Sequence, residues 1–199
     1  MFVPYYKTLL SYKLSEIAFN LGWEFTPLYY FKIEDSRQRD QIKQALRSFK
    51  QNIVEGTTDK SLSSKLKLYD VARASDAEAI EDFEDILKME GLLRWDQKDN
   101  RLVKIRSVVE SSSVSSLSLG SSLSSVLGAF GLRRLRGERV LRREEIEIIV
   151  NYILDVLVRA GYLLDRQIKA VEEKHRTVGG YSENLLKRRL QYRNYHAPS

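Results

Sequence analysis

The chain contains no cysteine, and only three prolines and ten glycines among its 199 residues. The missing cysteine excludes disulfides and thiolate metal sites, and it is typical of proteins in a reducing compartment. Few prolines and glycines leave few of the breakers that all-β folds place at their turns, which favours long helices. The composition therefore indicates an all-α chain without cross-links.

Long apolar runs are missing as well. No segment approaches the roughly 20 consecutive apolar residues that span a bilayer. The first residues, MFVPYYKTLLSYK, hold no continuous apolar run of the kind found in signal peptides. We therefore expect a soluble, cytoplasmic protein with no membrane partner.

Groups that carry out chemistry are scarce. The sequence has two histidines, His175 and His196. Glu172 and His175 match one half of the paired motif of di-iron bundles, but Arg193 stands three residues before His196, so the second half is missing. No P-loop, dinucleotide-binding fingerprint or nucleophile elbow occurs. We expect no catalytic residue, no metal site and no cofactor, and thus a protein that is not an enzyme.

Charge, in contrast, is abundant. Charged residues make up 30% of the chain, and the formal net charge is +6. Basic and acidic residues nearly balance over residues 1–106, and the excess falls in the remainder. An excess this mild permits a phosphate-rich partner without requiring one.

Apolar residues recur at three- and four-residue steps through most of the chain, which predicts helices. The first runs from about Tyr6 to about Ile33, with a kink or break near Phe25–Pro27. The others are Arg37–Glu55, capped by Asp35 or Ser36; Ser61–Glu90, closed by Gly91; Arg101–Val109; Arg143–Lys174, ended by Gly179 and Gly180; and a last short helix capped by Ser182. The four long helices bury their faces best as an antiparallel up-down four-helix bundle with a short C-terminal suffix helix.

These elements divide the chain into four parts. Residues 1–110 hold the first three bundle helices, residues 138–176 the fourth, and residues 177–199 the C-terminal suffix segment. Residues 111–137 form a linker, because Ser111–Gly131 is rich in serine and glycine. Its scattered leucines and Phe130 leave room for a weakly docked helix.

Two basic clusters are candidate nucleic-acid contacts. The first lies on the second helix, where the stripe spans roughly 16 Å and could meet backbone phosphates; the alternative is that it pairs with the acidic third helix. The second is interleaved with Leu185, Leu186, Leu190 and Tyr192, so docking on the bundle or on another subunit is favoured over RNA binding. The residues concerned are Arg37, Arg39, Lys43, Arg47 and Lys50 in the first cluster, and Lys187, Arg188 and Arg189 in the second.

The stretch Ser48–Gly56, SFKQNIVEG, ends the second helix, and two roles are open for it. It builds a turn, with Gly56 at positive φ, Asn52 bonding the last carbonyls or loop amides, and Glu55 receiving loop amides or an arginine such as Arg73. Alternatively, it contacts a ligand directly. We favour the turn.

The segment Arg39–Leu92 resembles the four helix bundle protein family, which includes proteins encoded in intervening sequences of bacterial 23S ribosomal RNA genes and, more distantly, accessory proteins of diversity-generating retroelements. The signature residues are Ser48, Asn52, Ile53, Glu55 and Gly56, followed by the small and acidic residues Val71–Asp85. Gly161–Arg193 is similar to the suffix extension of some members. The resemblance implies a self-assembling bundle, expected as a homopentameric ring or barrel. It also implies a basic surface, which in retroelement members engages RNA or DNA and a reverse transcriptase, and no enzyme activity.

Two functions follow from these observations. The first is a non-enzymatic, oligomeric, nucleic-acid-binding accessory protein. The alternative is a protein–protein scaffold in which the basic second helix and the acidic third helix meet across subunits and set the assembly.

Overall fold

The structure is a computed structural model that describes residues 3–109, 122–133, 140–179 and 181–195. Most of these residues are helical, and no strand occurs among them. The elements are the 3-10 turn η1 (Tyr5–Thr8) and the helices α1 (Leu10–Tyr29), α2 (Ser36–Thr58), α3 (Leu62–Met89), α4 (Asn100–Val109), α5 (Leu123–Gly128), α6 (Arg143–Val178) and α7 (Tyr181–Tyr195). The all-α prediction is confirmed.

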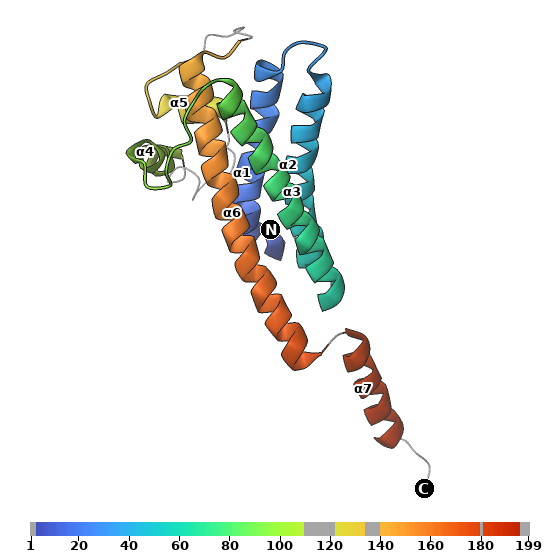
Figure 1. Cartoon of the computed structure of the whole chain (residues 1–199). Coiled ribbons are helices and arrows are strands. Elements are labelled where there is room, and N and C mark those ends of the chain that lie inside the picture. The colour runs from blue at the N-terminus through green and yellow to red at the C-terminus, as the bar shows by residue number, and fades with distance from the viewer. Residues whose placement is uncertain (1–2, 110–121, 134–139, 180, 196–199) are drawn as a thin grey trace.

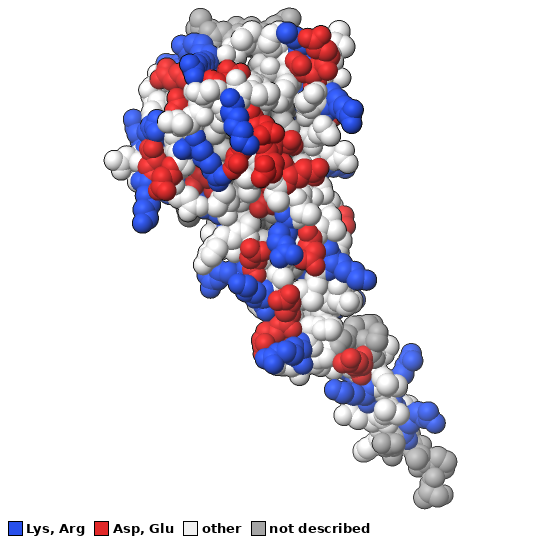
Figure 2. Space-filling model, viewed as in Figure 1, with Lys and Arg blue, Asp and Glu red and all other residues white. Residues whose placement is uncertain are grey.

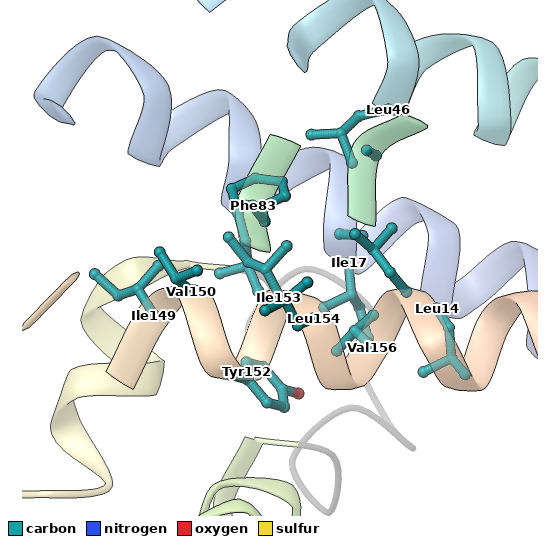
Figure 3. Packing of buried hydrophobic residues seen from close by; sticks show 14 of the residues in the cluster. Leu14, Ile17, Leu46, Phe83, Ile149, Val150, Tyr152, Ile153, Leu154 and Val156 are labelled. Carbon is teal, nitrogen blue, oxygen red and sulfur yellow. The ribbon is translucent and has the colours of Figure 1, made fainter. Parts of the chain in front are cut away.

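Four long helices, α1, α2, α3 and α6, pack side by side, and we call them the helical core (Figure 1). α1 contacts α2 and α6, and α3 contacts α2 and α6. Side chains from all four meet in the interior, where Phe83 and Leu46 face residues of α6 such as Ile153 (Figure 3). Burial of these apolar faces is the main favourable term for the fold.

α6 is the most deeply buried helix. All residues from Glu145 to Leu157 are buried except Glu147, because the short helices α4 and α5 cover the side of α6 that faces away from α1 and α3. Tyr152 points to that second side, opposite Ile153 and Leu154 (Figure 3). The segment predicted as a linker thus contains a docked helix: α5 buries Leu123, Val126 and Leu127. Residues 110–121 and 134–139 of the predicted linker lie outside the described residues.

The first predicted helix differs from the structure at both ends. A 3-10 turn precedes α1, which starts at Leu10 and ends at Tyr29 rather than Ile33. The predicted kink or break near Phe25–Pro27 places the end of the helix slightly too early, because α1 continues through Pro27 for two residues before it ends. Two contacts hold this last turn. Within α1 the Tyr29 ring stacks on buried Phe25 with centroids 5.5 Å apart, and the Tyr29 hydroxyl makes a tertiary contact by donating to Glu90 Oε1 over 2.8 Å.

The second predicted helix is too short. α2 continues three residues beyond Glu55, and Gly56 is a buried residue inside it, without a positive φ. A Cβ built on Gly56 would lie 2.6 Å from two ring carbons of Tyr69 on α3. Gly56 is therefore required by close helix packing, and the prediction of a left-handed turn there is wrong. Asp35 occupies the N-cap position, but its side chain makes no capping hydrogen bond.

The ends of the remaining helices agree more closely with those predicted from the sequence. The Ser61 side chain caps α3, and Gly91 closes it with φ of 61°. α6 ends at Val178 rather than Lys174, and Gly179 then has φ of 79°. α7 already begins at Tyr181, so Ser182 lies within its first turn instead of preceding it. No helix in the described ranges is long and apolar enough to cross a membrane.

Candidate nucleic-acid interface

The basic stripe of α2 lies against two aromatic side chains of α1. Lys43 Nζ is 4.4 Å from the centroid of the Trp23 ring, and Lys50 Nζ is 3.8 Å from that of Phe19. The two rings are themselves 5.5 Å apart. Phe19 and Trp23 are four residues apart on α1, and Lys43 and Lys50 are seven apart on α2. Each spacing places the two side chains in one row along its helix, so the two rows can pair. Ammonium groups over aromatic faces are stabilised electrostatically.

The alternative in which this stripe pairs with acidic α3 is wrong for the single chain. Ile42, Leu46 and Phe49 turn toward the core, which places the neighbouring cations on the α1 side of α2. The Arg39 guanidinium bonds the Tyr30 carbonyl over 3.4 Å and lies 3.8 Å from Asp40. Among the described residues, no carboxylate of α3 forms an ion pair with the stripe.

We call this surface the cationic face, consisting of Phe19, Trp23, Arg39, Lys43, Arg47 and Lys50. Trp23 lies on the outer side of α1 and is 51% exposed. Arg47 is exposed and forms no ion pair or hydrogen bond with a described residue, and the same holds for nearby Arg37. The face therefore combines cations with an accessible indole, which is the combination that single-stranded nucleic acids need for phosphate contact and base stacking.

Lys50, at one end of the cationic face, is partly buried, and this affects its pKa. Burial lowers the pKa of Lys50, an effect that Arg47 strengthens and the Glu16 carboxylate opposes. Glu16 in turn accepts a hydrogen bond of 2.7 Å from the Tyr12 hydroxyl. A partly desolvated ammonium interacts more strongly with an anion than one in bulk water does.

The second predicted basic cluster lies on α7, which extends beyond the foot of the helical core (Figures 1 and 2). Lys187, Arg188 and Arg189 are exposed and pair with no described carboxylate. The apolar residues on either side of them in the sequence are also exposed, at 36% to 66%: Leu185, Leu186, Leu190 and Tyr192. The predicted docking of this segment on its own bundle is therefore not what the structure shows, and the two basic clusters do not form one surface.

The Ser48–Gly56 motif lies within α2 and packs against α3. Asn52 Nδ2 donates to the Ser48 carbonyl over 2.8 Å and to Ser48 Oγ over 3.1 Å. Ser48 Oγ is 2.8 Å from Ser75 Oγ, which donates to the Val71 carbonyl over 2.9 Å. These partners are all internal, so Ser48 and Asn52 serve the packing of α2 against α3.

The predicted partner of Glu55 is wrong. Glu55 accepts a hydrogen bond of 3.2 Å from Gln51, whereas Arg73 pairs with Asp70 at 3.0 Å and lies 3.9 Å from Asp165. Arg73 lies four residues beyond Tyr69 on α3 and is directed toward α6 instead of the end of α2.

Sequence reasoning missed a polar row on α6, formed by Glu147, Asn151 and Asp155. Asn151 accepts from the Trp95 amide over 2.7 Å and donates to the Leu93 carbonyl over 3.2 Å, and Glu147 accepts from the Trp95 indole over 2.8 Å. The buried Asp155 carboxylate binds Arg106 of α4 at both oxygens. The four-residue spacing of these polar residues within an otherwise apolar stretch of sequence is the signal that could have revealed the row. It holds the segment from Leu93 to α4 against the core.

One buried carboxylate has no such partners. Asp76 on α3 is 5% exposed, its Oδ1 has no hydrogen-bond partner, and its Oδ2 approaches α6 at Gly161, where a Cβ would lie 2.3 Å away. Burial and then the neighbouring Asp165 carboxylate raise the pKa of Asp76 to about 8. No group of three or more histidines and carboxylates in the described ranges could hold a metal ion.

Comparison of the chain with protein-family models, with curated proteins and with solved structures finds no match. The resemblance to the four helix bundle protein family stays a prediction.

Proposed function

We propose that the chain is a non-enzymatic, self-assembling four-helix bundle protein of the cytoplasm that binds RNA or DNA through the cationic face. The observation that carries this proposal is the arrangement of Arg39, Lys43, Arg47 and Lys50 beside the exposed Trp23 ring. The cyclic packing of α1, α2, α3 and α6 supports the antiparallel bundle.

The chemistry of this face favours a single strand. Cations four residues apart on a helix repeat about every 6 Å, close to the spacing of successive phosphates in an extended strand. Stacking of a base on an aromatic ring contributes about 1–3 kcal/mol and tolerates any sequence. Phosphate contacts position the strand without reading its bases, so binding should depend strongly on salt and weakly on sequence.

A second candidate function is a protein–protein scaffold, which the uncovered apolar residues of α7 favour. The two candidates are compatible, because α7 and the cationic face are separate surfaces. The family resemblance of Arg39–Leu92 supports both, and it adds a pentameric ring and a reverse transcriptase partner as further proposals.

The test is binding of a fluorescently labelled single-stranded RNA, followed by anisotropy as salt is raised. We expect the affinity of the native chain to fall with a log–log slope of about −2, as three phosphate contacts predict. The triple variant Arg39→Gln, Lys43→Gln, Arg47→Gln should bind at least tenfold more weakly, on the order of 1.4 kcal/mol.

The matched control replaces three exposed lysines elsewhere, Lys67, Lys98 and Lys169, by glutamine, which removes the same charge. This control should retain most of the affinity. Binding that ignores salt, or equal loss in both triple variants with circular dichroism unchanged, would contradict the proposal.

A further inference from the structure

A hollow of about 240 Å³ lies between α2 and α3, on the side of α2 away from the cationic face. The apolar part of its lining, which we call the floor, is Tyr30, Ile42 and Met89. The polar part, which we call the rim, is Gln38, Gln41, Asp82, Asp85 and Lys88. Met89 is 64% exposed there. We call this surface the acidic groove.

The carboxylates around the acidic groove outnumber their partners. Glu78, Glu81, Asp82 and Asp85 lie within two turns of α3, and Lys88, 2.9 Å from Asp85, is the lysine within reach. Burial and then the neighbouring carboxylates Glu78 and Asp85 raise the pKa of Asp82. Figure 2 shows acidic side chains gathered over this half of α3.

α7 has the opposite composition. It carries four cations against one carboxylate, Glu183. At 100° per residue, Leu186 and Leu190 form an apolar stripe, with Arg189 and Arg193 along one edge and Lys187 along the other. An apolar stripe between cations is complementary to an apolar floor with an acidic rim.

The groove of the same chain is out of reach of α7. α7 starts beside the beginning of α3, where Leu62 and Leu185 line one hollow. The acidic groove lies about 30 Å further along α3, from Leu62 to Asp82, whereas a helix of the length of α7 spans about 22 Å. The helix that fills the groove must therefore come from another molecule.

We propose that α7 of one copy docks in the acidic groove of a second copy, with Leu186 and Leu190 on the apolar floor and Arg189 and Arg193 against Asp82 and Asp85. The contact joins two different surfaces, so each molecule can give its tail to one neighbour and receive the tail of another, which builds a ring or a chain of subunits. This inference rests on the self-assembly part of the proposed function and is independent of nucleic-acid binding.

The test uses two charge reversals in the full chain and measures mass by light scattering. The native protein should exceed the 23.1 kDa of one chain at tens of micromolar. The tail variant (Arg189→Glu, Arg193→Glu) and the groove variant (Asp82→Lys, Asp85→Lys) should each run as single chains, because like charges now meet. Mixed in equal amounts, they should recover the larger mass, since the reversed tail fits the reversed groove.

Two further variants control for folding and for total charge. Leu186→Ser with Leu190→Ser should also yield single chains with an unchanged melting temperature, because both side chains are exposed in the isolated molecule. Lys67→Glu with Lys98→Glu changes charge as the tail variant does but should keep the native mass.

Three results would overturn the inference: a native protein that runs at the mass of one chain, reversed variants that keep the native mass, or a mixture that fails to reassemble. If the tail variant kept its mass and instead lost RNA binding, α7 would be a nucleic-acid contact. Because the Arg39, Lys43, Arg47 variant should lose RNA binding while keeping its mass, failure of the docking and failure of the proposed function are distinguishable.

Discussion

At the scale of single residues, Asp76 is the group least suited to its surroundings. Its carboxyl group faces Gly161 and Asp165 of α6, and Asp165 itself lies 3.9 Å from Arg73. An ionised carboxylate without hydrogen bonds is costly to bury. Burial and then the Asp165 carboxylate raise the pKa of Asp76 to about 8, so the folded chain keeps this proton at neutral pH. The group thus links folding to pH.

We expect the free energy of unfolding to fall as pH rises between roughly 4 and 8, because the unfolded chain loses this proton near its ordinary pKa of 3.8 and the folded chain retains it to about 8. Asp76→Asn removes the linkage. It should stabilise the protein by up to about 5 kcal/mol near pH 8 and have little effect near pH 4. Urea unfolding at several pH values measures this, and a variant with the same pH slope as the native chain would refute it.

At the scale of elements, three glycines set how closely the helices approach. A Cβ on Gly22 of α1 would lie 2.2 Å from Leu46 of α2, while Gly56 and Gly161 make corresponding contacts between α2 and α3 and between α3 and α6. The neighbours of Gly22 and Gly161 are the ends of side chains that can rotate. Gly56 faces the rigid Tyr69 ring, so it tolerates a side chain least.

Gly56→Ala should therefore lower the free energy of unfolding by about 1–3 kcal/mol, the range for overpacked cores. Gly128→Ala at the end of α5 is the control, because nothing lies within 4 Å of its added Cβ. That control should be neutral or slightly stabilising, since alanine favours helix. Chemical denaturation of both variants measures the difference. Equal stability of the two would contradict the claim that Gly56 is required by close packing against Tyr69.

Periodicity alone located the helices but not the faces they turn to one another. α3 and α4 were predictable to within about one residue because Ser61, Gly91 and the apolar spacing mark them. The role of Gly56 was mispredicted because glycine is favoured both at positions with positive φ and at positions where two helices approach closely. The basic stripe was visible in the sequence, but its partners Phe19 and Trp23 depend on the rotation of α1, which only the packed core determines.

At the scale of the whole molecule, α6 extends further than the core it helps to build. Ile168 is its last buried residue, and α7 buries none of its described side chains (Figure 1). The end of α6 and all of α7 therefore add little apolar burial to the folded single chain.

Removal of residues 180–199 should then leave the thermal unfolding midpoint within about 2 °C of the native value in dilute solution. At high concentration the native midpoint should rise, because assembly stabilises the folded form by mass action, and that of the shortened chain should not. Differential scanning calorimetry across a concentration series measures both. A large drop in dilute solution would show that α7 stabilises its own core.

The two tryptophans differ in a way that makes the molecule its own optical probe. Trp95 is 7% exposed beneath the Arg101 guanidinium, whereas Trp23 on α1 is 51% exposed beside Lys43. Indole emission shifts to the red in water, so the two residues contribute separable bands. The blue component follows detachment of the segment before α4, and the red component follows any molecule that covers Lys43 and its neighbours, without an attached dye.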